Sequence, residues 1–116
     1  MRNLTITRRK SIVASLATVK VYIEDSSCHE LMINGVPCRK LGTLRNGESN
    51  TFAIGNGAAK VFVIADKLSK GFSNEFYQLT AGNEDISLSG QNKLNPTTGN
   101  PFLFDNNRNF DVLANR

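Results

Sequence analysis

Two stretches of the chain share one pattern: LRNGESNTFAI at Leu44–Ile54 and LTAGNEDISL at Leu79–Leu88. Each begins with Leu-x-x-Gly, continues through a polar spacer and ends on two apolar residues separated by one position. Glycine accepts a positive φ at little cost, and apolar residues at every second position are typical of a half-buried strand. Each stretch therefore predicts a corner in the chain that leads into a strand.

The two corners differ in their spacers, which run from Gly47 to Phe52 in one and from Gly82 to Ile86 in the other. Nothing else aligns around them, so we interpret them as two equivalent corners of one sandwich rather than as duplicated domains. This interpretation places the two glycines in turns and predicts burial of four side chains, namely Phe52, Ile54, Ile86 and Leu88.

Other segments also have the pattern of strands. In TVKVYIED, Val19, Val21 and Ile23 point to one face. AKVFVIAD is apolar without interruption from Val61 to Ile64, which predicts a central strand buried on both faces. Asn34-Gly35 indicates a tight hairpin turn.

Regular spacing of short strands between turns favours an all-β, single-domain antiparallel sandwich, Ig-like or jelly-roll-like, with about seven or eight strands. At 116 residues, one core is the expectation. We assign residues 1–104 to the sandwich and 105–116 to a polar, frayed tail. A helical turn at residues 11–17 is an alternative that leaves the class unchanged. SGQNKLNPTTGN, from Ser89, is expected to be a long loop.

The net charge of +4 is concentrated near the N-terminus, where residues 1–45 carry eight basic and three acidic groups. Such an excess can hold phosphate or an acidic partner, although a mildly basic solvated surface is the commoner explanation. Leu4 and Ile6 alternate with polar neighbours and predict a first strand, and ELMINGVPCRKL, after TVKVYIED, is the third. If these two strands are neighbours, one basic patch forms from Arg8, Arg9, Lys10, Arg39 and Lys40.

Single-stranded nucleic acid binding also requires exposed aromatic rings for stacking. Tyr22, on the polar face of its strand, is the candidate exposed aromatic. The phenylalanines suit the core better, which argues against a nucleic acid partner. Tyr77 is expected to pack at the sandwich edge with its hydroxyl bonded to nearby backbone, and sugar stacking is the alternative.

The chain has one histidine and two cysteines, too few ligands for a zinc site. Two reduced thiols, Cys28 and Cys38, are the default, and a disulfide requires that they lie on paired strands. His29 and Cys28 are adjacent on a strand and point apart, so they do not form a nucleophile pair. The start of the chain lacks a secretory apolar segment, and no run approaches a membrane span, so a cytoplasmic location is expected.

Neighbouring carboxylates occur at Glu24-Asp25 and Glu84-Asp85. A calcium site from Asn83, Glu84 and Asp85 lacks the characteristic Asp-x-Asp spacing, so we predict no metal and no cofactor. The chain contains none of the common nucleotide, hydrolase or metalloprotease motifs. We therefore predict no catalytic residues.

The order VKVYIED, ING, LRNGESNTFAI, GNGAAKVFVI and YQLTAGNEDISL resembles the small bacterial β-sandwich domains typified by PEGA-like domains, over about residues 17–90. The chain lacks their Pro-Glu-Gly-Ala signature and has LTAG where a Pro-Gly corner is usual. Such domains are accessory modules, often attached to larger envelope or signalling proteins, so the resemblance implies binding or spacing rather than catalysis. It carries over no binding residues.

The sequence thus predicts a non-catalytic sandwich that acts through protein contact or as a structural module of a bacterial protein. The exposed strand edges expected of an open sandwich are able to pair with a partner or a second copy. The alternative is a module for glycan or an anionic polymer that uses the N-terminal basic residues.

Overall fold

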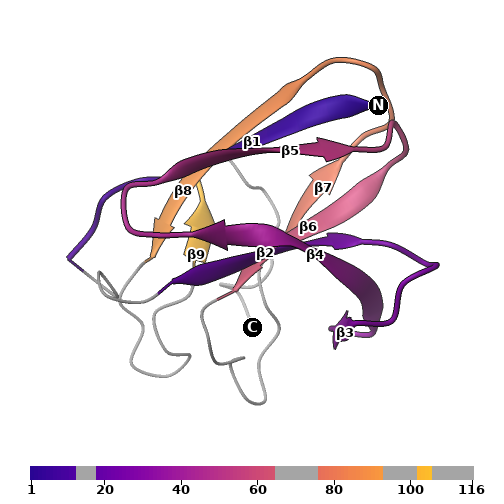
Figure 1. Cartoon of the computed structure of the whole chain (residues 1–116), viewed down its shortest axis with the longest axis horizontal. Coiled ribbons are helices and arrows are strands. Elements are labelled where there is room, and N and C mark those ends of the chain that lie inside the picture. The colour runs from indigo at the N-terminus through magenta and orange to yellow at the C-terminus, as the bar shows by residue number, and fades with distance from the viewer. Residues whose placement is uncertain (13–17, 65–75, 93–101, 106–116) are drawn as a thin grey trace.

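The computed structural model describes residues 1–12, 18–64, 76–92 and 102–105. All regular structure in these ranges is β-strand (Figure 1). The nine strands they contain are β1 (Arg2–Arg8), β2 (Val19–Glu24), β3 (Leu31–Ile33), β4 (Val36–Leu44), β5 (Ser49–Ile54), β6 (Ala59–Ile64), β7 (Phe76–Leu79), β8 (Ile86–Asn92) and β9 (Phe102–Phe104). The predicted all-β class is confirmed.

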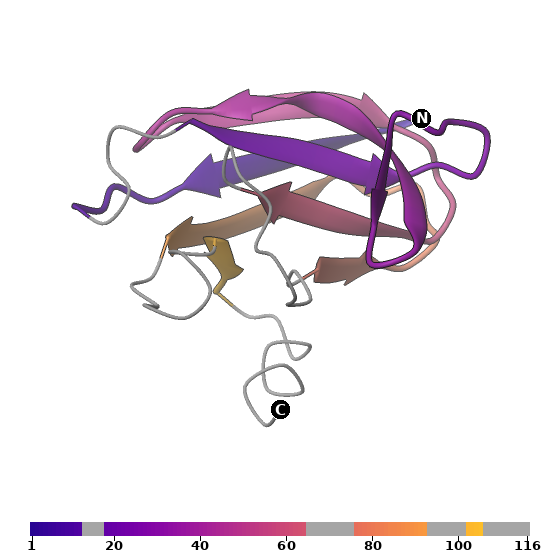
Figure 2. The ribbon, with the colours of Figure 1, turned by 90° about the horizontal axis from the view of Figure 1, so that it is seen from below.

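The strands form two packed sheets. One has four strands in the order β5-β1-β8-β9, and the other has five in the order β3-β4-β2-β6-β7. In Figure 1, β1, β5 and β8 lie in the upper layer, with β2 and β4 below them. Figure 2, seen from below, shows the violet β2 beside the rose β6 in the five-stranded sheet. The molecule is a β-sandwich.

One strand pair departs from the antiparallel pattern. β1 runs antiparallel to β5 but parallel to β8, while the other pairings of the described residues are antiparallel. Parallel neighbours cannot be joined by a tight hairpin, and β1 and β8 are in fact far apart in the chain. The pair therefore links the two ends of the described sequence within one sheet.

The two Leu-x-x-Gly segments are equivalent corners, as predicted. Leu44 ends β4 and Leu79 ends β7, and each corner carries the chain from the five-stranded to the four-stranded sheet. Both leucines are buried. Gly47 lies in a turn with φ 78°, whereas Gly82 lies in the β7–β8 connection without a left-handed φ. Only the first corner therefore uses the conformational freedom of glycine.

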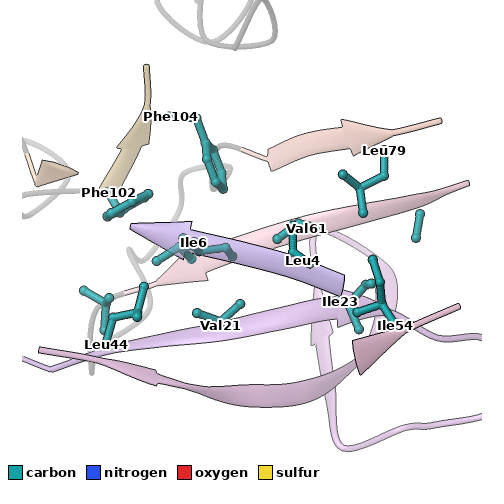
Figure 3. Close-up of a cluster of buried hydrophobic side chains, with 13 residues drawn as sticks. Leu4, Ile6, Val21, Ile23, Leu44, Ile54, Val61, Leu79, Phe102 and Phe104 are labelled. Atoms are coloured by element: carbon teal, nitrogen blue, oxygen red, sulfur yellow. The ribbon is translucent and has the colours of Figure 1, made fainter. Parts of the chain in front are cut away.

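The main core lies between the sheets (Figure 3). Leu4 and Ile6 of β1 face inward because they occupy alternate positions of the strand. They pack with inward-facing side chains of the opposite sheet, among them Val21, Ile23 and Val61. This contiguous cluster supplies the apolar burial that stabilises the sandwich.

Of the four side chains expected in the core beyond the corners, only Ile54 is fully buried. Phe52, Ile86 and Leu88 are half-buried and pack against the cluster. The reason is their position at the sides of the sandwich. β5 is an edge strand, and β9 pairs with β8 only from Gly90 onward.

β6 is buried on both faces, which confirms the prediction for AKVFVIAD. Val61 and Val63 belong to the main core, while Phe62 and Ile64 belong to a second cluster on the other face of the sheet. Tyr22 of β2 lies in this second cluster as well. The five-stranded sheet is therefore apolar on both faces around β2 and β6.

Asn34 and Gly35 form the predicted hairpin turn, with φ 52° and 81° between the paired residues Ile33 and Val36. The loop predicted from Ser89 is wrong for residues 89–92, which belong to β8, and the rest of that loop lies outside the described ranges. Two other predictions fall on undescribed residues: the helical turn within 11–17, of which 13–17 lie outside the described ranges, and the tail from residue 106 onward.

Candidate functional site

A groove at one end of the sandwich has a volume of about 460 Å³. It lies between the chain after β2, the start of β4 and the β5–β6 turn. Its lining includes the buried apolar residues Ile23 and Ala59, and its charged side chains are Glu24, Asp25 and Arg39. The volume falls within the range of small-molecule sites.

The charged groups of this groove already have partners. Asp25 accepts hydrogen bonds from the Ser27 amide at 3.0 Å and the Ser27 hydroxyl at 2.6 Å, and it pairs with Arg39 Nε at 3.1 Å. The Ser27 hydrogen bonds, with the Arg39 charge, lower the pKa of Asp25. Glu24 Oε1 accepts the Lys60 amide at 3.0 Å. These contacts brace the loops, and the lowered pKa makes Asp25 a fixed ionised acceptor rather than a general acid.

The predicted basic patch does not form. Arg8, Arg9 and Lys10 lie at the end of β1 in the four-stranded sheet, whereas Arg39 and Lys40 belong to β4 in the other sheet. Arg8 reaches the last residue of β4, and Arg39 is five residues away from it, or about 17 Å of extended strand. The charges are therefore spread over the molecule.

Arg8 is not a surface residue. Its side chain is 1% exposed, and it donates to Asn92 Oδ1 and to the Leu44 carbonyl, each at 3.0 Å. Burial lowers the pKa of its guanidinium. Arg8 shares the inward face of β1 with Leu4 and Ile6, since it lies two positions beyond Ile6. Its inclusion in an exposed patch was wrong.

Two of the remaining patch residues are held by acids. Arg9 forms an ion pair with Asp105, at the end of β9, and Arg39 pairs with Asp25. Lys10 lies against Gly47 in the first corner, and Lys40 is exposed on β4. The geometry does not focus positive charge on one face.

Tyr22 is not an exposed aromatic. It is 9% exposed and packs in the second cluster with Phe62 and Cys38. The alternation of β2 does place it opposite Val21 and Ile23, as predicted, but that outer face is apolar here. Tyr22 therefore cannot act as a stacking platform.

Arg2 is buried at the other end of β1, with 4% exposure. It donates from Nε to the Gly55 carbonyl and from Nη2 to the Gly57 carbonyl, both at 3.1 Å. Its Nη1 also lies beside Gly82, whose amide donates to the Asn56 carbonyl at 2.9 Å. Arg2 thus ties the β5–β6 turn to the second corner.

The side chains considered above for calcium binding and sugar stacking make contacts within the fold. Asp85 accepts the Asn3 amide at 2.9 Å, and Asn83 accepts from Asn56 Nδ2 at 2.8 Å. The ring of Tyr77 packs on Phe104, with centroids 5.6 Å apart. The predicted bond from the Tyr77 hydroxyl to backbone is not present within the described part of the chain.

The cysteines are both free thiols, and Cys38 is fully buried in the second cluster. Burial, followed by the charge of Glu24, raises the pKa of Cys38 to about 11. His29 is exposed in the β2–β3 connection next to Cys28. Because the thiolate is the reactive form, Cys38 is a core side chain rather than a nucleophile.

The free edge of β5 is the most available binding surface in the described chain. The sheets have four edge strands, β5, β9, β3 and β7, and β5 is the longest of them with six residues. Its sequence SNTFAI contains neither a charged residue nor proline. Charges and prolines are what natural edge strands commonly use to prevent further pairing.

Hydrogen bonding fixes which groups of β5 point outward. The Arg8 amide donates to the Glu48 carbonyl at 2.9 Å, so these two residues form a hydrogen-bonded pair of the antiparallel ladder. Hydrogen-bonded and non-hydrogen-bonded pairs alternate in such a ladder, so Ile6 and Asn50, two residues away on each strand, form the next hydrogen-bonded pair. The intervening residues of β5 direct their amides and carbonyls away from β1. These residues are Ser49, Thr51 and Ala53, all with exposed side chains.

The outer face beside this edge is lined by hydroxyls. Thr5 and Thr51 are opposite each other with their hydroxyl oxygens 2.7 Å apart, and Thr7 and Ser49 with theirs 2.9 Å apart. In an antiparallel ladder, side chains approach most closely in the pairs that are not hydrogen-bonded through the backbone. The short distances between these hydroxyls therefore agree with outward-directed amides at Thr51 and Ser49. The face is polar and uncharged across β5 and β1.

Sequence reasoning foresaw an exposed edge but did not locate it on β5, and it missed the buried arginines. The sequence carries a signal for the arginines, because RNLTITR places Arg2 and Arg8 in phase with Leu4 and Ile6. It carries none for the open edge, because the order of strands in the sheet decides which strand lies there.

Comparison with protein-family models, curated proteins and solved structures gives no match. Among the residues that the structure describes, no helix has the length and apolarity needed to cross a membrane.

Proposed function

We propose that this protein is a non-catalytic interaction module that binds an extended protein segment by strand addition to β5. The observation that carries the proposal is the row of outward amides and carbonyls at Ser49, Thr51 and Ala53 on a six-residue edge. In strand addition, main-chain hydrogen bonds supply affinity and alternate side chains supply specificity. The proposal agrees with the accessory role that the resemblance to PEGA-like domains implies.

The packing of β5 on β4 supports this role. Phe52 of β5 turns inward against Gly42 of β4, where a Cβ added to Gly42 would lie 2.7 Å from the ring. β5 is thereby anchored on its inner face, while no strand of the described residues pairs with its outer edge. A preformed edge of this kind loses little conformational entropy when a strand adds to it.

A direct test uses labelled protein and a panel of short synthetic β-forming peptides, with backbone amide shifts recorded by NMR. Binding is expected to shift the amides of Ser49, Thr51 and Ala53 more than those of β8. Thr51→Pro should abolish binding yet keep the fold, because the amide it removes points away from β1. Thr51→Ala is the matched control, since it keeps that amide and should retain binding. Shifts elsewhere, or equal binding by the proline variant, would contradict the proposal.

A further inference from the structure

The free edge of β5 is self-complementary. Its outward-directed residues are spaced symmetrically about Thr51, with Ser49 on one side and Ala53 on the other. If two copies of β5 run antiparallel with Thr51 on the two-fold axis, Thr51 lies opposite its own copy and Ser49 lies opposite Ala53. All three outward residues then form hydrogen-bonded pairs, which gives about six main-chain bonds in total.

Other two-fold registers use the edge less fully. An axis at Asn50 pairs Ser49 with Thr51 and leaves Ala53 to face the corner of the other copy. An axis at Phe52 pairs Thr51 with Ala53 and leaves Ser49 to face the β5–β6 turn. Each of these registers makes about four main-chain bonds between strand residues, so the axis at Thr51 is preferred.

Side chains favour the same register. The facing residues are small and uncharged, so no like charges oppose each other across the new pair. The Thr51 pair would continue the row of hydroxyls that already joins Thr5 to Thr51 at 2.7 Å. Threonine pairs across strands are favourable contacts on a sheet face.

We infer that the occupant of this edge is a second copy of the chain, in an antiparallel β5–β5 pair centred on Thr51. The inference rests on the proposed function and specifies its partner. The pair joins two four-stranded sheets into one continuous sheet. A symmetric contact of this kind closes on itself and gives a dimer rather than a filament.

Sedimentation velocity across the micromolar to millimolar range tests this inference. The native chain is expected to show a concentration-dependent dimer. Thr51→Lys and Thr51→Glu should each raise the dissociation constant about tenfold or more, because like charges then face each other across the axis. An equimolar mixture of the two variants should recover the dimer, since opposite charges then meet.

The matched controls are Ser87→Lys and Ser87→Glu, which place the same charges on an exposed position of β8, a strand that β1 separates from β5. They should dimerise like the native chain, and mixing them should change nothing. A native chain that stays monomeric at millimolar concentration, or Thr51 variants that dimerise normally, would overturn the inference. If peptides still bind β5 in that case, the proposed function stands with another partner; if they do not, it falls too.

Discussion

At the residue scale, the buried guanidinium of Arg8 is the most consequential single group. A buried charge is costly unless its donors are matched, and two of the matching acceptors here are Asn92 Oδ1 and the Leu44 carbonyl. These acceptors belong to β8 and to the end of β4, in different sheets. Arg8 therefore contributes to stability by joining the two sheets through hydrogen bonds at one end of the sandwich.

Arg8→Met is expected to lower the free energy of unfolding by about 2 to 4 kcal/mol, because two buried acceptors lose their donor. Arg9→Met is the control, since it removes the same charge from the next residue, an exposed one, and should cost less than about 1 kcal/mol. Urea denaturation followed by circular dichroism measures both. Equal losses for the two variants would show that the buried bonds of Arg8 do not stabilise the fold.

Cys38 gives a pH dependence whose sign can be worked out. Its pKa is about 11 in the fold against about 9 for an ordinary thiol. Between these values the unfolded chain has released the proton that the fold retains, so stability falls as pH rises. The contribution is complete below pH 9 and is lost toward pH 11, up to about 2 to 3 kcal/mol.

Cys38→Ala should lack this alkaline decline, whatever its constant cost in packing, and Cys28→Ala should keep it. The measurement is urea unfolding at a series of pH values from neutral to alkaline. Parallel curves for the native chain and Cys38→Ala would rule out the buried thiol as the source.

At the scale of elements, the pairing of β8 with β9 depends on the absence of a side chain at Gly90. A Cβ there would lie 2.3 Å from the Leu103 carbonyl oxygen and 2.8 Å from the ring of Phe102. Because the nearest atom is backbone, β9 itself would have to move. The phenylalanines that β9 contributes to the core, Phe102 and Phe104, would move with it.

Gly90→Ala is therefore expected to destabilise the protein by about 2 kcal/mol or more through overpacking. It should also increase amide hydrogen exchange in β9 before exchange elsewhere in the sheet. Gly55→Ala is the control, because nothing lies within 4 Å of its added Cβ. If the two alanine variants unfold at the same urea concentration, the close approach of β9 to β8 is not a constraint.

The sequence was most informative about individual strands. Alternation identified β1 through Leu4 and Ile6, and continuous apolarity identified β6 as buried on both faces. Burial of Arg2 and Arg8 could not be predicted by residue type, since arginine is rarely buried unless paired, and the pairing is with carbonyls distant in the chain. The position of β5 at a sheet edge could not be predicted either, because the order of strands in a sheet, and not the local sequence pattern, decides which strand lies at the edge.

At the scale of the whole molecule, β1 joins the two ends of the sandwich. Arg8 bonds to the carbonyl of Leu44, where the first corner begins, and Arg2 lies beside Gly82 of the second corner while holding the β5–β6 turn. The two corners are at opposite ends, because Leu44 pairs with Val19 at the start of β2, whereas Leu79 pairs with Ala59 at the start of β6, which runs antiparallel to β2. One strand thus contacts both corners at which the chain passes from the five-stranded to the four-stranded sheet.

This arrangement predicts how the losses of stability from mutations at the two ends add together. Arg2 and Arg8 are six residues apart on an extended strand, about 20 Å, and share none of the bonding partners named here. Arg2→Met should lower the free energy of unfolding, as Arg8→Met does, because the Gly55 and Gly57 carbonyls lose a charged donor. The double variant should lose the sum of the two within about 0.5 kcal/mol, as measured by urea denaturation at neutral pH. A double loss well below the sum would mean that removing one arginine already releases β1 from both ends, and that the corners are held as one cooperative unit rather than separately.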